Sequence, residues 1–525
     1  METSPSRIEP VVVVGAGPVG LTLGIELIRR GVPCRVVDRL ASPVHTSRAF
    51  TLHARTLEVF AMTGLARQLI ERGIESRGLT FHFPREGEVA QLDFTRLDSR
   101  YPYILIISQN TVESVLRERF LELGGEVEWQ TEITAIAQGE DGQIRARLHH
   151  VEGGREEEIA PRWLVGCDGL RSLVRENLGI PFEGDQYSGQ EMRMMDVPLS
   201  GWPLGDDAIH YLLREDSMLL VTKLPGKSYR LLVSDKGTSR RTQTARSDFQ
   251  MLIDEHVSGV VVGEPEWATV FTLWKRISTA YRRGRVFLCG DAAHIHSPAG
   301  GQGMNACLND ALNLGWKLAL VARGEAGEAL LDSYEEERRP IAKQVIEGSH
   351  LMHMVIMAHG TPLAERIQIT KQPGYNLKTV RQVSGLAYSY RASTGSDVDG
   401  IADGDRAPDA PITATTSVHD LLENPYYTLL LFHSDPSGAA SLSGLGADIS
   451  ARYGDRVRAR IVSAPSVAAS APAGALVAET EGAHHRYGAL ERDVYCLVRA
   501  DGYIALRREV SNRADLDHLL GRVLV

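Results

Sequence analysis

The first apolar run of the chain predicts a buried strand that leads straight into a glycine-rich turn. Val11 to Val14 are four consecutive β-branched residues, which is typical of a parallel strand covered on both faces. The turn Gly15-Ala16-Gly17-Pro18-Val19-Gly20 follows, and a helical pattern then covers residues 21–30. A second apolar run, Cys34 to Val37, ends at Asp38. Strand, glycine turn, helix, strand and acid in this order predict a dinucleotide-binding unit.

The glycine turn has a physical interpretation at each position. Gly15 makes the turn possible, Gly17 lets the backbone approach a pyrophosphate, and Gly20 lets the helix pack closely on the strand. The N-terminus of the helix offers free N–H groups and partial positive charge to phosphates. Asp38 is placed to accept hydrogen bonds from a ribose. A glycine-rich turn of another α/β protein is the alternative, and this turn alone does not separate FAD from NAD.

Two later strands also end in turns that carry an aspartate. A strand at 163–166 leads to Asp168-Gly169, with the helix that follows expected to hold Ser172 to Arg175. A strand at 285–289 leads to Gly290-Asp291. A loop rich in glycine comes next, and a long helix is then expected to run to about Val321, with apolar residues along one face.

Short apolar runs between these motifs predict an inserted β-sheet. Ile209 to Leu213, Met218 to Lys223 and Tyr229 to Ser234 are separated by turn residues such as Pro225-Gly226. We therefore expect an α/β chain with a discontinuous cofactor domain at 1–72, 100–182 and 278–390, and a β-sheet substrate domain at 73–99 and 183–277.

The composition turns to Ser, Gly, Asp and Pro around residues 392–412, which indicates a domain boundary and a C-terminal domain at 400–525. Strand-like runs occur there at Tyr426 to Phe432 and Val457 to Val462, and Asp501-Gly502 predicts a hairpin. The domain contains only Cys496, so it cannot perform dithiol chemistry.

Composition excludes several classes of partner. The net charge of -10 argues against nucleic acid or an anionic membrane. The stretch Val11 to Ile28 is nearly uncharged, but Pro18 and four glycines argue against a membrane span. No targeting segment is evident. The five cysteines are scattered without a zinc-binding spacing, so we expect free buried thiols, no metal and a reducing cytoplasm.

Together the three turns resemble the para-hydroxybenzoate hydroxylase-like group of flavoprotein monooxygenases. That group joins a GxGxxG fingerprint to a DG motif and a GD motif in this order, and the resemblance covers about residues 10–350. The run His294 to Asn305 is similar to one in a subgroup that hydroxylates aromatic polyketides and antibiotics and includes rifampicin monooxygenase. The resemblance implies FAD, a substrate sheet that roofs the flavin, a Rossmann-like FAD domain, a thioredoxin-like C-terminal domain and a role in antibiotic biosynthesis.

The resemblance also implies which residues contact FAD. Asp291 is expected at the ribityl chain, Pro298 beside the ring, and Gln109 at the ribityl chain, with Thr111 as a simple helix cap the alternative. Arg48, in Ser47-Arg48-Ala49, is expected at the flavin and pyrophosphate, and a surface arginine is the alternative. The full expected set is Gly15, Gly17, Pro18, Gly20, Asp38, Arg39, Arg48, Gln109, Asp168, Gly290, Asp291, Pro298, Gly301, Gly303, Met304 and Asn305.

The glycines near residue 300 have a chemical interpretation of their own. Gly300, Gly301 and Gly303 carry no side chains that would block a flat ring from lying against the backbone. The N–H groups of Gly303, Met304 and Asn305 are expected to begin the next helix. A helix N-terminus aimed at the ring would stabilise the negative charge of reduced flavin without a titrating side chain.

The implied reaction is aromatic hydroxylation. NADPH or NADH reduces FAD and leaves, and O2 then gives a C4a-hydroperoxide that oxidises a phenolic or polyketide-type substrate. The flavin carries the chemistry, so no catalytic side chain is identified. His210, Tyr211 and His296 are candidates for the substrate pocket, with a plain pocket-wall or surface role as the alternative for each. The family analogy leaves a homodimer open.

Three other functions stay open. Baeyer–Villiger oxygen insertion is the first, although the FxGxxxHxxxWP signature is absent. The second is a flavin-binding protein that sequesters an aromatic ligand, and the third is an oxygen-independent flavin dehydrogenase. Halogenation is disfavoured because none of the six tryptophans lies in a WxWxIP motif.

Overall fold

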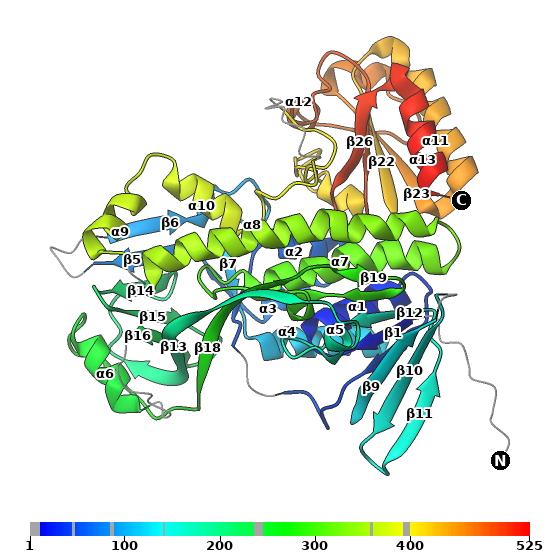
Figure 1. The fold of residues 1–525 in the computed structure, drawn as a ribbon. Coiled ribbons are helices and arrows are strands. Elements are labelled where there is room, and N and C mark those ends of the chain that lie inside the picture. The colour runs from blue at the N-terminus through cyan, green and yellow to red at the C-terminus, as the bar shows by residue number, and fades with distance from the viewer. Residues whose placement is uncertain are drawn as a thin grey trace, which may run out of the picture.

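A computed structural model of the chain describes residues 11–44, 48–83, 89–139, 142–235, 245–357, 361–391 and 400–524. These residues form sheets with helices packed around and between them, which confirms the α/β class (Figure 1). Ser47 and the segment 392–399 of the expected boundary lie outside the described residues. The division into domains at the residues given above stays a prediction.

The central sheet brings the three turns together. Its strands β1, β12 and β20 lie side by side and run parallel, so their carboxyl ends meet at one edge of the sheet. All four residues of β1 are buried, as the uninterrupted valine run predicts. The order across this sheet is β19 (Arg282–Arg283), β20 (Val286–Leu288), β12 (Trp163–Gly166), β1 (Val11–Val14), β2 (Arg35–Val37) and β8 (Val127–Glu128).

Helices cover this sheet closely because glycines remove side chains at their crossings. Helix α1 packs on α4 and α7. A Cβ on Gly24 of α1 would lie 2.7 Å from the Phe120 ring of α4, and one on Gly315 of α7 would lie 2.5 Å from Glu26 of α1. Proline starts α1 three residues earlier than predicted, because its fixed φ suits the first helical position. The helices of this part are α1 (Pro18–Ile28), α2 (Ala54–Met62), α3 (Ala66–Glu71), α4 (Gln109–Glu122), α5 (Leu173–Asn177), α7 (Gly303–Ala322) and α8 (Asp332–Ile356).

A second, nine-stranded sheet stands beside the carboxyl edge of the central sheet. The three strands predicted between residues 209 and 234 are confirmed to within one residue at each end, and strands of the 74–93 region join them. The order is β21 (His294–Ile295), β18 (Trp267–Ser278), β13 (Phe182–Ser200), β16 (Ser228–Asp235), β15 (Ser217–Lys223), β14 (Ile209–Leu213), β5 (Gly78–His82) and β6 (Val89–Asp93), with β17 (Val261–Val262) on β13.

The interpretation of 183–277 as strands alone is wrong at one place. Helix α6 (Arg246–Asp254) lies there, and it buries Phe249 and Ile253, which are spaced one helical turn apart. Two small sheets complete this half of the molecule, with the orders β3 (Thr51–Leu52), β7 (Ile104–Ile106), β4 (Ile74–Ser76) and β11 (Arg155–Ile159), β10 (Ile144–His150), β9 (Thr131–Gln138).

The C-terminal residues form a separate sheet that lies on the outer side of α7 and α8 (Figure 1). Strands β22, β23 and β24 are parallel. Strand β25 is antiparallel to β22, and β25 and β26 pair antiparallel as the hairpin predicted at Asp501-Gly502. The sheet order is β24 (Leu476–Val477), β23 (Val457–Ser463), β22 (Tyr427–His433), β25 (Val494–Val498) and β26 (Ile504–Glu509). The remaining helices are α9 (Leu363–Thr370), α10 (Tyr375–Val383), α11 (Ala439–Tyr453), α12 (Gly482–Arg486) and α13 (Arg513–Val523). Likeness to thioredoxin stays a prediction.

None of the helices in the described ranges is both long and apolar enough to cross a bilayer. Within the same ranges, no group of three or more His, Cys, Asp or Glu side chains is arranged to hold a metal ion. The five cysteines are free thiols, of which Cys34 and Cys167 are only half-buried.

Candidate functional site

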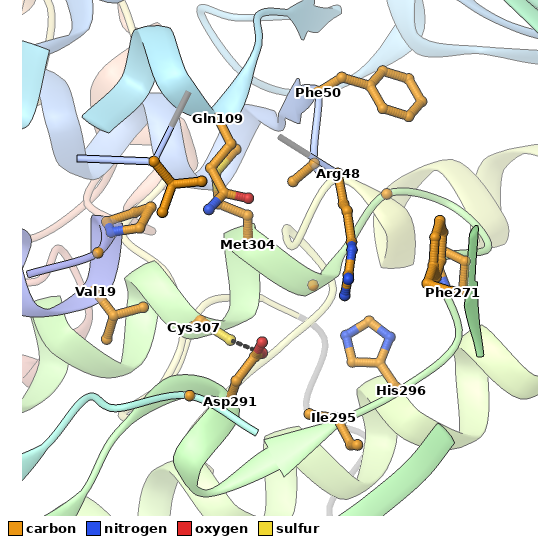
Figure 2. A pocket seen from close by; sticks show the side chains of 18 of the residues that line it. Val19, Arg48, Phe50, Gln109, Phe271, Asp291, Ile295, His296, Met304 and Cys307 are labelled. Atoms are coloured by element: carbon orange, nitrogen blue, oxygen red, sulfur yellow. Dashed lines mark hydrogen bonds between the residues drawn. The ribbon is translucent and has the colours of Figure 1, made fainter. Parts of the chain in front are cut away.

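A cavity of about 710 Å³ lies between the carboxyl edge of the central sheet and the nine-stranded sheet. Its volume is typical of sites for small molecules and cofactors. Figure 2 shows the Arg48 guanidinium, the Asp291 carboxylate and the His296 ring facing the same space. Of the predicted cofactor contacts, its lining includes Gly15, Gly17, Pro18, Asp38, Arg39, Arg48, Gln109, Asp168, Asp291, Pro298, Gly301, Gly303 and Met304.

The three glycines of the first turn have different structural roles. Gly15 has a φ of +106°, and a Cβ there would lie 2.5 Å from the carbonyl oxygen of Cys167. A Cβ on Gly20 would lie 1.9 Å from the Gly15 oxygen, so Gly20 stands behind the cavity and permits the tight helix–strand packing. Around Gly17, no described atom lies within 4 Å of a Cβ position. Space for a ligand therefore exists at Gly17, next to the N-terminus of α1.

Two aspartates border this end of the cavity. The Asp38 carboxylate accepts hydrogen bonds from the N–H of Ala16 at 2.7 Å and of Leu40 at 2.9 Å, and each oxygen keeps a second lone pair for a ligand hydroxyl. Asp168 accepts from the N–H of Val174 at 3.1 Å through Oδ2, while its buried Oδ1 has no partner among the described residues. Burial raises the pKa of Asp168.

The helix after Asp168 differs slightly from the prediction. Ser172 is not on α5 but caps it, because its hydroxyl accepts a hydrogen bond from the N–H of Arg175 at 3.0 Å. The Arg175 guanidinium donates to the carbonyl oxygens of Ala292 and Leu170, both at 2.9 Å. Arg175 thereby ties the turn of Asp168 to the turn of Asp291.

Asp291 faces the cavity from the end of β20. Its side chain is exposed to the cavity, and the Cys307 thiol donates to its carboxylate at 3.3 Å (Figure 2). Burial raises the pKa of Asp291. Gly290 has a φ of +66° and stands behind the lining, because a Cβ there would lie 3.0 Å from Val19 of α1. This arrangement suits a carboxylate that accepts hydrogen bonds from the hydroxyls of a bound chain.

The glycines near residue 300 are needed for more than clearance. Gly300 and Gly301 have φ values of +82° and +66°. A Cβ on Gly300 would lie 2.9 Å from the sulfur of Met352, and one on Gly301 would lie 2.4 Å from the Thr51 hydroxyl. Only Gly303 leaves clear space, since the nearest described atom to its Cβ position is His296 Nε2 at 4.0 Å. Clear space for a flat ring therefore explains the glycine at position 303. Backbone conformation and close packing explain the glycines at positions 300 and 301.

Asn305 supports the loop with its side chain. Its amide nitrogen donates to the carbonyl oxygens of Thr51 and Gly301, both at 3.0 Å, and its oxygen accepts from the N–H of His53 at 2.8 Å. The side chain therefore stands behind the lining. Helix α7 begins at Gly303, as predicted, so the N–H groups of its first turn are what this region offers a ligand.

Arg48 and Gln109 line the cavity, and their contacts with FAD stay a prediction, whereas the expected cap of α4 is corrected. The Arg48 guanidinium lies 5.1 Å from the centre of the Phe271 ring. Gln109 is the first residue of α4 and donates to Glu113 Oε1 at 2.9 Å. The cap is Ser108, not Thr111, because the Ser108 hydroxyl accepts from the N–H of Thr111 at 3.2 Å.

The three candidates for the substrate pocket do not share one location. Tyr211 and His296 line the cavity, but His210 does not. Successive side chains of a strand point to opposite faces, so Ile209 and Tyr211 face the cavity and His210 faces away. His210 instead contacts His82, with 3.1 Å between ring nitrogens, and the carbonyl oxygen of Gly205. Burial raises the pKa of Tyr211 far above its ordinary value.

Two imidazoles, the buried His53 and the half-buried His296, flank the loop at Pro298, and the sequence singled out only His296. His296 Nδ1 donates to the carbonyl oxygen of Ser297 at 2.7 Å, and His53 Nε2 donates to that of Gly300 at 3.0 Å. The other ring nitrogen of each has no partner among the described residues. Burial lowers the pKa of both to about 4, so both rings are neutral at pH 7. His53 was missed because a single histidine after a two-residue strand carries no motif.

The residues present fit FAD. The clear space at Gly17 and the start of α1 suit a pyrophosphate, and the unpartnered Asp168 oxygen suits a donor on a bound group. Asp38 follows β2 and Asp291 follows β20, with β1 and β12 between these strands, and both aspartates line the same cavity, as the ribose and ribityl chain of one extended molecule require. The far end of the cavity is lined by aromatic and aliphatic side chains.

Comparison with known proteins agrees with this geometry. A family described as "FAD binding domain" matches residues 9–349. The pentachlorophenol 4-monooxygenase of Sphingobium chlorophenolicum is 45% identical over 428 residues, which are 80% of this chain and 79% of that protein. The 6-methylpretetramide 4-monooxygenase of Streptomyces rimosus is 35% identical over 96% of this chain and 92% of its own.

A solved structure gives the same result for the fold. The anhydrotetracycline hydroxylase OxyS of Streptomyces rimosus superposes with a TM-score of 0.77 at 30% identity, over 98% of this chain and 99% of that chain. The resemblance inferred from the three turns is thereby confirmed, and so is FAD as the cofactor. The chain therefore belongs to the FAD-binding domain family and is an FAD-dependent enzyme of the monooxygenase type.

Proposed function

We propose that the chain uses NAD(P)H and O2 to hydroxylate a phenolic or polyketide-type aromatic molecule. The observation that carries this proposal is one continuous cavity, with groups that suit FAD at one end and aromatic and aliphatic walls at the other. FAD, when bound, supplies the redox chemistry, and the hydroperoxide route expected from the resemblance is part of the proposal. The relatives support an aromatic substrate, since their names specify a chlorinated phenol and polyketides.

The protein contributes binding, orientation and charge stabilisation. The start of α1 and Gly17 would hold the pyrophosphate, Asp38 the ribose, and Asp291 the ribityl chain. The N–H groups at the start of α7 would stabilise negative charge on the reduced ring. His53 and His296 are neutral at pH 7, so this stabilisation would come from the N–H groups and not from an imidazolium. The aromatic and aliphatic walls would exclude water during oxygen transfer.

An arginine-lined groove supports the use of NAD(P)H. The groove has a volume of about 570 Å³ and shares Arg48 and Phe271 with the main cavity. Its lining also contains Arg171, Arg175 and Arg276, and these arginines with Arg48 outnumber the two carboxylates there, Glu176 and Glu191. Arginine is suited to phosphate recognition, so an anionic dinucleotide could approach the ring from this groove and leave again. This source of positive charge is local, because the chain as a whole carries a net charge of -10.

The test is oxygen incorporation by the FAD-loaded protein. We expect aromatic-stimulated NADPH oxidation and a product that carries one ¹⁸O atom from ¹⁸O2. NMR of the product separates a new phenolic hydroxyl from an inserted ester oxygen, because both add the same mass. Tight aromatic binding without oxygen transfer would favour a sequestering protein instead. Reduction and reoxidation of FAD without ¹⁸O in the product would favour a dehydrogenase.

A further inference from the structure

The wall that the nine-stranded sheet presents to the cavity has an ordered pattern of side chains. Five neighbouring strands each contribute one residue, and these five residues are direct cross-strand partners, so they form a single row across the sheet. We call it the wall row, and its members in order are Tyr211, Leu220, Leu232, Met194 and Thr269.

The polar atoms of the wall row stand only at its two ends. Tyr211 and Thr269 carry hydroxyls, whereas Leu220, Leu232 and Met194 between them are buried and carry none. Strands are spaced about 4.8 Å apart, so this apolar centre extends over roughly 10 Å between its outer Cα atoms. A substituted aromatic ring lying on it meets hydrocarbon and thioether surface alone.

Aromatic rings lie next to the wall row, since Trp267 and Arg230 precede Thr269 and Leu232 by two residues on β18 and β16 and so share their face of the sheet. The Arg230 guanidinium lies 5.4 Å from the centre of the Phe50 ring and 5.6 Å from that of Trp267. Arg230 is fully paired with Asp196, with N–O distances of 2.8 and 2.7 Å. It therefore holds the two rings in place and does not offer its charge to a ligand carboxylate.

These walls discriminate against polar substituents. A hydroxyl or amide buried against Leu220, Leu232 or Met194 finds no hydrogen-bond partner among them, and such a loss weakens binding by roughly tenfold or more for each group. A halogen or a methyl group of similar size leaves no hydrogen-bonding group unpaired there, and its burial strengthens binding. The wall row thus distinguishes ring substituents by polarity and not by size.

The geometry points to weakly polar phenols as the substrate class, with halogen or short alkyl substituents on the ring and few hydroxyls or amides. This inference rests on the proposed function and narrows it. Hydroxyl- and amide-rich polyketides fall outside it, although relatives of this chain act on such molecules by name.

The experiment uses three ligands with one shape: 2,6-dimethylphenol, 2,6-dichlorophenol and 1,2,3-trihydroxybenzene. Binding to the FAD-loaded, oxidised enzyme is followed by the change in flavin absorbance, without turnover. We expect the dimethyl and dichloro compounds to bind at least tenfold more tightly than the trihydroxy compound. The hydroxyl of 2,6-dichlorophenol is more acidic than that of 2,6-dimethylphenol. Tight binding of the dimethyl compound therefore shows that the preference does not depend on ionisation of the phenol. Anhydrotetracycline, as a polyketide probe, is expected to bind more weakly than 2,6-dimethylphenol.

A pair of variants assigns the preference to the wall row. Leu232→Asn places an amide at its centre and is expected to reverse the order within the trio. Leu232→Met, of similar volume and apolar, is expected to keep it. FAD content of each variant reports that the fold is intact.

Equal affinities for the trio, no binding of any member, or tighter binding of anhydrotetracycline than of 2,6-dimethylphenol would overturn the inference. So would an unchanged order in FAD-loaded Leu232→Asn. Because ¹⁸O incorporation is measured separately, an enzyme that oxygenates only polyketides would refute the substrate class and leave the proposed function standing.

Discussion

The Asp310 carboxylate accepts a hydrogen bond from His294, with 2.8 Å between Oδ2 and Nε2, and both side chains are completely buried. The same carboxylate accepts from Arg338 Nε of helix α8 at 2.7 Å and from the N–H of Gly290 at 3.4 Å. Asp310 lies on α7, so it joins two long helices to the turn that carries Asp291. Burial alone would raise its pKa, but Arg338 and His294 outweigh this and lower the pKa of Asp310.

Asp310→Asn is predicted to loosen the turn of Asp291. The change leaves Arg338 buried with one charged partner fewer, and breaking such a pair costs about 3 kcal/mol or more of the free energy of unfolding. We also expect FAD affinity to fall by about tenfold or more. Denaturant unfolding and fluorescence titration of FAD measure the two effects. The control is Asp332→Asn, which removes an exposed partner of Arg282. Equal behaviour of the two variants would show that Asp310 does not position the turn.

His53 is predicted to make the protein acid-sensitive. Burial lowers its pKa from 6.5 to about 4, so below pH 6.5 the unfolded chain binds more protons than the folded one. The free energy of unfolding should therefore fall as the pH falls from 6.5 towards 4, by up to roughly 3 kcal/mol from this residue. Urea unfolding at pH 7, 6 and 5 measures it, and His53→Gln should show a smaller slope than the parent. Parallel curves for the two proteins would contradict the assignment.

Gly17 and Gly20 are predicted to fail in different ways when substituted. Gly17→Val adds atoms where no described atom lies within 4 Å, so the fold should persist while FAD affinity falls roughly 100-fold or more. Gly20→Ala places a Cβ 1.9 Å from the Gly15 oxygen and should destabilise the fold itself. Thermal unfolding of the apoprotein and FAD titration separate the two. If Gly17→Val bound FAD normally, the pyrophosphate would have to lie elsewhere.

Sequence patterns were sufficient where the contacts are local. The valine run, the turn at Gly15 and the strands between residues 209 and 234 all follow from periodicity and turn residues, and the structure confirms them. Helix α6 was missed because its apolar face consists of little more than Phe249 and Ile253.

Features that depend on tertiary contacts were not predictable in the same way. His210 was selected with Tyr211, yet only the placement of the sheet decides which face of β14 borders the cavity. The wall row joins residues as distant as Met194 and Thr269 through strand register. The hydrogen bonds of Asp310 with Arg338, His294 and Gly290 likewise depend on the packing of α7 and α8, since no motif links Asp310 to Arg338.

Glu337 is predicted to hold the C-terminal sheet on the long helices. Its carboxylate lies 2.7 Å from Nη1 of Arg499, which directly follows β25, and 2.7 Å from Lys317 Nζ of α7. Burial lowers the pKa of Lys317 to about 8, and the attraction of Glu337 limits that fall. Glu337→Gln should therefore cost about 3 kcal/mol of the free energy of unfolding. The exposed pair of Arg452 and Asp517 is the control, since Asp517→Asn should cost less than about 1 kcal/mol.

The pH dependence of Glu337→Gln distinguishes lost charge pairing from a packing defect. Without Glu337 the pKa of Lys317 falls further, so the folded variant binds fewer protons than its unfolded form over a range that extends below pH 8. Its free energy of unfolding should therefore rise more steeply between pH 7 and 8 than that of the parent, in which Lys317 only begins to lose its proton there, and the deficit should shrink. A deficit that is constant across this range would mean that the variant disturbs packing and that Lys317 does not depend on Glu337 for its charge.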